Sequence, residues 1–133
     1  MKSKDVIPRA LAERDINDAL DFYLAEASRK VALGFIDTLE RAYRLIGERP
    51  DAGSSRYAHE LDLPGLRSWP LRGYPYVVFY IAREDHIDVW RVLHPASDIP
   101  AWMAGADPEA RPPNKTPSVF RRTLFHPALK APR

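Results

Sequence analysis

The sequence contains no cysteine and only four histidines in its 133 residues. Without cysteine there is no disulfide framework and no thiolate zinc site, and the scattered histidines lack the short spacing of metal-ligand pairs. No segment approaches the roughly 20 apolar residues of a membrane span, and no apolar run typical of a signal peptide follows the basic start. We therefore expect a cytoplasmic protein that uses no metal and no cofactor.

Lysine is also missing from most of the chain, since none lies between Lys30 and Lys115. Residues 1–103 hold 14 Lys and Arg against 16 Asp and Glu, whereas residues 104–133 hold 6 against 2 and six of the thirteen prolines. This shift predicts a folded domain over 1–103 and a Pro-rich basic tail over 104–133, extended or disordered. The pI near 9.0 therefore does not indicate that the folded part binds nucleic acid.

The apolar residues that are present change their spacing along the chain. The segment 6–11 is short and mostly apolar, which predicts a strand. It contains Pro8, which cannot donate a ladder hydrogen bond, so the strand should lie at an edge of the sheet. From Ala12 apolar residues recur every three or four positions, which predicts a first helix. A second such helix runs from its N-cap Ser28 to Pro50. The short link between them predicts an antiparallel helical hairpin.

After a loop the apolar spacing changes to strand-like alternation, which predicts strands over 66–71, 76–82 and 87–93 joined by short turns as an antiparallel meander. Alternation puts two sets of side chains on opposite faces, namely Val77, Phe79 and Ile81 against Tyr76, Val78 and Tyr80. The hairpin must cover one face, since three strands alone are marginal. The predicted fold class is α+β: a short N-terminal strand, an antiparallel two-helix hairpin on a three-stranded antiparallel meander, and a Pro-rich C-terminal tail.

Six motifs in this order resemble the RelE/ParE superfamily, the toxins of bacterial type II toxin–antitoxin pairs. They cover about residues 5–103 and read Ala12-x-x-Asp15, Phe35-Ile36-Asp37-x-Leu39, Arg49-Pro50-x-x-Gly53, Leu66-Arg67-x-Trp69-Pro70-Leu71, Gly73-Tyr74-Pro75-Tyr76-Val77-Val78-Phe79-Tyr80 and Arg91-Val92-Leu93-His94. The resemblance is closer to the ParE branch, whose members poison DNA gyrase, than to the RelE branch, whose members cut mRNA at the ribosome. It implies a growth inhibitor that is not an enzyme.

The resemblance also implies a cognate antitoxin as partner in a hetero-oligomer. Such antitoxins lay apolar side chains into the groove between helices and sheet, and often add a strand to an exposed sheet edge. The candidate residues for antitoxin or target contact, each of which also fits an ordinary core role, are Phe22, Phe35, Leu39, Trp69, Tyr76, Trp90 and Trp102.

A ribonuclease of the RelE kind is the first alternative, acting on mRNA at the ribosome. Its chemistry needs proton-transfer groups beside fixed positive charge, and the candidates are Arg67, Tyr80, Arg91 and His94. The meander has no lysine, and arginine transfers protons poorly because it stays charged. Structural roles compete with each candidate. His94 can position the loop that follows it, and Arg91, if it shares a face with Val89 and Leu93 towards the hairpin, needs an acidic partner.

A non-toxic binding module of the same fold is the second alternative. Family members often carry an arginine near the position of Ser97, before an aspartate, but the segment here reads Pro95-Ala96-Ser97-Asp98-Ile99. The tail over 104–133 also lies outside the family's pattern. Because the C-terminal end is implicated in the toxicity of ParE-like proteins, both departures bear on activity.

Overall fold

The computed structural model describes residues 3–94 and 99–106. Its elements are β1 (Asp5–Pro8), α1 (Ala10–Glu26), α2 (Arg29–Glu48), the 3-10 helix η1 (Pro50–Ala52), α3 (Arg56–Glu60), β2 (Leu66–Pro70), β3 (Val77–Ala82), β4 (His86–Leu93) and α4 (Ile99–Ala106). The α+β class is confirmed, with the strand, the hairpin and the meander in the predicted order. The predicted tail lies outside the described residues from 107 onward.

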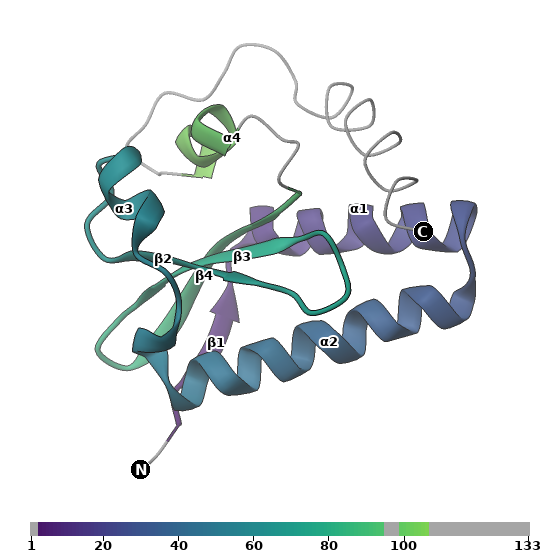
Figure 1. The fold of residues 1–133 in the computed structure, drawn as a ribbon, viewed down its shortest axis with the longest axis horizontal. Coiled ribbons are helices and arrows are strands. Elements are labelled where there is room, and N and C mark those ends of the chain that lie inside the picture. The colour runs from purple at the N-terminus through teal and green to yellow at the C-terminus, as the bar shows by residue number, and fades with distance from the viewer. Residues whose placement is uncertain (1–2, 95–98, 107–133) are drawn as a thin grey trace.

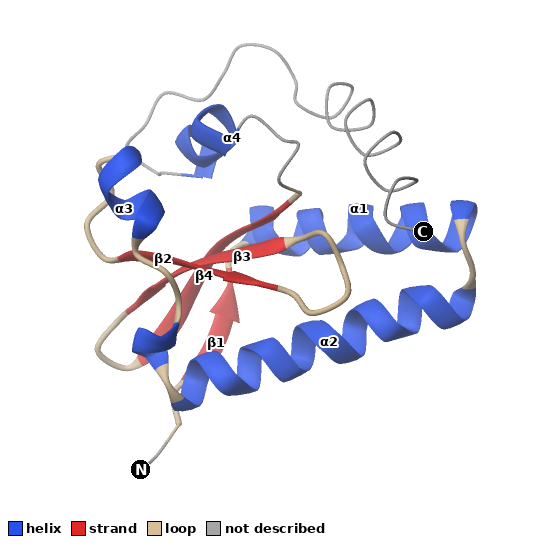
Figure 2. Cartoon of the chain, in the orientation of Figure 1, coloured by secondary structure: helices blue, strands red, loops and turns tan. Residues whose placement is uncertain are grey.

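The four strands form one sheet in the order β1-β4-β3-β2 (Figure 2). The strands β2, β3 and β4 are antiparallel neighbours, which confirms the meander. The strand β1 instead pairs with β4 in parallel, with Val6 opposite Ile87. As expected for a strand that contains Pro8, β1 lies at an edge of the sheet.

Helices cover both faces of this sheet (Figure 1). The hairpin of α1 and α2 packs on the face that carries Tyr76, Val78 and Tyr80. The opposite face, with Phe79 and Ile81, is covered by residues of α4 and α3. The predicted alternation of faces in β3 is therefore confirmed, and each face has its own apolar cluster.

The amphipathic pattern of α2 explains how the hairpin docks. Its buried residues follow helical spacing and are Ala32, Phe35, Leu39, Ala42, Ile46 and Gly47. The Ser28 hydroxyl accepts a hydrogen bond from the Val31 N–H at 3.1 Å, which confirms the predicted N-cap. The helix ends at Glu48, two residues before Pro50, as proline requires.

The structure differs from the sequence prediction at the end of β1 and at α3. The strand predicted over 6–11 is too long, because β1 ends at Pro8 and α1 begins at Ala10. Its last ladder bond is donated by the Arg9 N–H to the Val89 carbonyl at 2.9 Å. The helix α3 was not predicted, since its five residues carry too short a pattern.

A β-bulge in β4 separates the residues that were predicted to share a face with Arg91. Val89 pairs with Tyr80 and Arg91 with Phe79, so Trp90 is an extra residue between two ladder pairs. The bulge reverses the alternation beyond it, and Val89 and Leu93 therefore belong to different apolar clusters. The prediction that these two residues and Arg91 share one face was wrong.

Candidate functional site

Two of the residues considered for RNA cleavage, Arg67 and Tyr80, hold the segment that follows α2. The Tyr80 hydroxyl donates to the Pro50 carbonyl at 2.8 Å and accepts from the Gly53 N–H at 3.0 Å. The Arg67 guanidinium donates to the Gly53 carbonyl at 2.7 Å and to that of Asp51 at 3.2 Å. Tyr80 is fully buried, and desolvation raises its pKa. Together the two side chains pair the carbonyls of Pro50, Asp51 and Gly53 and the Gly53 N–H, and so fix the backbone of this segment.

The third candidate, Arg91, is buried against an acid from α1. Its guanidinium makes two hydrogen bonds to the Asp15 carboxylate, at 2.8 and 2.7 Å, and a third to the Trp102 carbonyl at 2.8 Å. The same carboxylate accepts from the Val92 N–H at 3.0 Å. The strand β1 pairs with β4 only as far as Val89. Beyond that point the Asp15 carboxylate accepts the Val92 N–H in place of a neighbouring strand. The expectation that Arg91 needs an acidic partner is confirmed. The ion pair connects α1 with β4, and the bond from Arg91 to the Trp102 carbonyl connects β4 with α4.

The fourth candidate, His94, follows the end of β4 and is 6% exposed. Its ring packs edge-on against Tyr76, with 5.6 Å between the ring centroids. Burial lowers the pKa of the imidazole, because desolvation disfavours its charged form. A buried ring in contact with an aromatic neighbour fits the structural role that the sequence allowed for this residue.

These four residues do not form one reactive centre. Arg67 and Tyr80 are cross-strand neighbours that bind the segment after α2, whereas Arg91 on β4 binds Asp15 of α1 and the Trp102 carbonyl of α4. Three of the side chains are at most 6% exposed, and Arg67 is bound to backbone carbonyls. The arrangement fits packing and positioning of the chain rather than proton transfer to a substrate.

Replacing Tyr80 with phenylalanine is expected to lower the free energy of unfolding by about 1 to 3 kcal/mol, because the buried Gly53 N–H loses its acceptor. Urea denaturation of the two proteins measures the difference. The matched control is Tyr57→Phe, since Tyr57 is half-buried and its ring packs edge-on against Phe79. Equal stability of the Tyr80 variant and the original chain would contradict the assignment.

The seven residues predicted to contact an antitoxin or target divide into two groups. Six are core residues of this chain: Phe22, Phe35, Leu39 and Tyr76 belong to the hairpin cluster, and Trp90 and Trp102 to the cluster under α4. Only Trp69 is partly exposed at the margin of its cluster. A partner would have to displace α1, α2 or α4 to reach the six, whereas Trp69 is accessible without any rearrangement.

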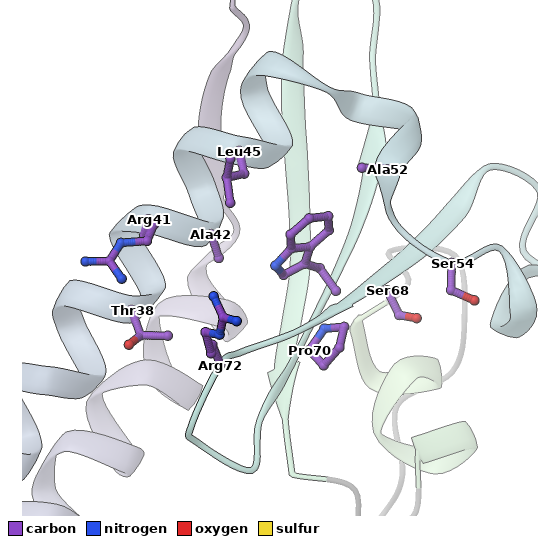
Figure 3. Close-up of a pocket in the computed structure, with 10 residues that line it drawn as sticks. Thr38, Arg41, Ala42, Leu45, Ala52, Ser54, Ser68, Pro70 and Arg72 are labelled. Atoms are coloured by element: carbon purple, nitrogen blue, oxygen red, sulfur yellow. The ribbon is translucent and has the colours of Figure 1, made fainter.

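Trp69 lines a groove of about 460 Å³ between α2 and β2. The helix contributes Thr38, Arg41, Ala42 and Leu45, and the strand contributes Ser68 and Pro70 next to Trp69. Figure 3 shows Thr38 and Arg41 projecting from α2, while Arg72, just after β2, rises towards the helix. Apart from Ala42, the α2 residues of the groove lie beside the buried stripe of that helix, so the apolar spacing of the sequence does not mark them.

The groove is apolar at its floor and positively charged at its rim. None of the residues that line it is acidic, whereas two are arginines, Arg41 and Arg72. Within the part of the chain that the structure describes, neither guanidinium makes a hydrogen bond or an ion pair. Leu45, which lines the groove with Trp69, is 40% exposed. The groove can therefore bind apolar groups that are accompanied by negative charge.

Neither a metal centre nor a membrane segment is found among residues 3–94 and 99–106. No cluster of three or more potential ligands from His, Asp and Glu occurs there, and no helix in these ranges has the length and apolarity to cross a bilayer.

Comparison with known proteins gives one family and one fold. Residues 6–99 match the family model described as the ParE toxin of the type II toxin–antitoxin system, parDE. Among solved structures, a chain of the "Chromosomal ParDE TA system from P. aeruginosa" is similar, with a TM-score of 0.58 and 16% identity. The alignment covers 69% of this chain and 96% of that one. No curated protein sequence matches.

Proposed function

The chain belongs to the family of ParE toxins of type II toxin–antitoxin systems, and from this premise we propose that it stops growth by binding DNA gyrase, without catalysis of its own. The observation that carries the non-enzymatic part is the engagement of Arg67, Tyr80, Arg91 and His94 in the fold itself. Gyrase follows from the resemblance of the motifs to the ParE branch. The site of action is then the cytoplasm, where gyrase works.

The second part of the proposal is neutralisation by a cognate antitoxin in a hetero-oligomer. The similarity to a chain of a ParDE system supports a protein partner. The exposed apolar groove beside Trp69 supports it as well, because accessible apolar surface of this kind marks interaction sites. The antitoxin would be encoded beside this gene.

We expect production of the chain without the neighbouring gene to arrest growth and to induce DNA-damage signalling while mRNA stays intact. Poisoned gyrase leaves broken DNA, whereas a ribosome-dependent ribonuclease leaves cut messages. Growth, a damage-responsive reporter and mRNA 5′-end mapping are followed together. Co-production of the neighbouring protein is the control and should restore growth.

Each other result assigns a different function. Arrest with cut mRNA and no damage signal would replace the gyrase proposal with the ribonuclease. Normal growth at a verified level of folded protein would leave a binding module of the same fold. A supercoiling assay with purified gyrase then tests the target directly, since the toxin should convert supercoiled DNA into cleaved DNA only when gyrase is present.

A further inference from the structure

The sheet edge formed by β2 is already occupied by the chain itself. Ser54 and Ser68 exchange two backbone hydrogen bonds, each 2.9 Å long, along the outer side of β2. The Leu66 N–H donates to the Leu63 carbonyl at 3.1 Å, and Pro70 has no N–H. Since outward-facing groups alternate along a strand, all three outward positions of β2 lack a free donor.

The opposite edge, β1, is closed in a similar way. The Lys4 N–H donates to the Gly47 carbonyl of α2 at 3.0 Å, and Pro8 again has no N–H, which leaves Val6 as the outward donor between them. The close contact depends on glycine, because a Cβ on Gly47 would lie 2.6 Å from the Lys4 oxygen. Where β4 extends past β1, the Asp15 carboxylate of α1 accepts a hydrogen bond from the Val92 N–H of β4. In the described parts of the chain, neither edge offers two successive free N–H donors for strand addition.

The groove between α2 and β2 offers a different mode of binding. Trp69 and the exposed Leu45 line it together with Arg41 and Arg72, whose guanidinium groups have no partner among residues 3–94 and 99–106. The hydroxyl groups of Thr38 and Ser54 also line it. Carboxylates of an occupant would form charge-assisted hydrogen bonds with the arginines. The basic tail of the chain itself, with 6 Lys and Arg against 2 acids over 104–133, has the wrong charge for this site.

We propose that the α2–β2 groove receives a segment of the antitoxin in which apolar side chains are flanked by Asp or Glu, and that this segment binds through its side chains without adding a strand to the sheet. The inference rests on the proposed function, because it takes the antitoxin as the occupant. It departs from the strand addition that the family resemblance implied. The apolar side chains pack on Trp69 and Leu45, and the acids meet Arg41 and Arg72.

Titration calorimetry with the purified product of the neighbouring gene tests the proposal. The variants are Arg41→Glu and Leu45→Ser, and each has a matched control on an exposed part of the same helix, Arg44→Glu and Leu33→Ser. We expect each groove variant to raise the Kd about tenfold or more, since a charge or apolar contact at the interface is lost, while both controls bind like the original chain. Circular dichroism verifies that all variants are folded.

The outcomes separate this proposal from the proposed function. If the original chain does not bind the neighbouring protein, the antitoxin partnership fails and this inference fails with it. If it binds but the groove variants match their controls, the partnership stands and the groove is not the site. A change of self-association in Arg41→Glu alone, measured by sedimentation, would assign the groove to a second copy of the chain instead.

Nuclear magnetic resonance supplies a second, independent readout of the binding mode. The protein has three tryptophans, of which Trp90 and Trp102 are buried. Binding in the groove should shift the indole N–H signal of Trp69 and leave the other two in place. Shifts confined to the backbone N–H signals of Lys4 to Ile7 would instead indicate strand addition at β1 and overturn the proposal.

Discussion

Replacing Asp15 with alanine is expected to lower the free energy of unfolding by about 3 to 5 kcal/mol, the usual effect of removing one partner of a buried ion pair. The Arg91 side chain is 3% exposed and would keep its charge without a carboxylate beside it. The Val92 N–H would lose its acceptor at the same time. Because small domains are stable by only about 5 to 15 kcal/mol, this loss is a large part of the total stability. Urea denaturation with a fluorescence readout measures the loss.

The control for this experiment is Asp21→Ala, which removes an exposed acid from the same helix and should change stability by no more than about 0.5 kcal/mol. A double variant, Asp15→Leu with Arg91→Met, removes both charges together and should recover most of the stability, since an apolar pair can replace a buried ion pair. A loss below about 1 kcal/mol for Asp15→Ala would show that the pair is solvated and not buried.

Replacing Phe35 with alanine is expected to cost about 3 to 5 kcal/mol, because a large cavity would open in the hairpin cluster. Phe35 is fully buried. Its ring centroid lies 5.7, 5.6 and 5.4 Å from those of Tyr23, Tyr74 and Tyr76, in tilted or edge-on geometry. Such contacts add to the apolar area that the ring buries. Thermal and urea denaturation should both report the loss.

The matched control is Leu33→Ala, because Leu33 lies two residues earlier on the same helix and is 55% exposed. It should leave stability almost unchanged. The comparison also separates the two roles that the sequence allowed for Phe35. A residue that serves mainly as an antitoxin contact would lose binding when truncated and keep its stability, which is the opposite of the result expected here.

The parts of the fold that the sequence predicted are those with a repeating pattern. The apolar spacing of α2 extends over twenty residues, and the alternation of β3 separates two clusters, so both elements and their orientation could be predicted. The N-cap Ser28 and the stop at Pro50 follow from local chemistry at single positions. Local signals of this kind need no knowledge of distant parts of the chain.

What could not be predicted depends on contacts between distant residues. An acid near a helix N-terminus is usually exposed and favoured by the helix dipole, and nothing in the sequence around Asp15 marks it as the partner of Arg91. The bulge at Trp90 shifts the face of every later residue in β4, yet one extra residue leaves no pattern. The groove was missed for the same reason, since Arg41 and Arg72 come together only when α2 packs beside β2.

The ion pair between Asp15 of α1 and Arg91 of β4 has a consequence for the synthesis of the protein. Asp15 and Arg91 are separated by 76 positions, and at about 5 to 20 residues per second the acid is made roughly 4 to 15 seconds before its partner. During that interval the nascent hairpin has no sheet to pack on and carries an acid that the folded state buries. The chain can therefore complete its fold only after its last strand has left the ribosome. Translation that stops before β4 therefore yields a chain that lacks both the partner strand of β1 and the partner of Asp15.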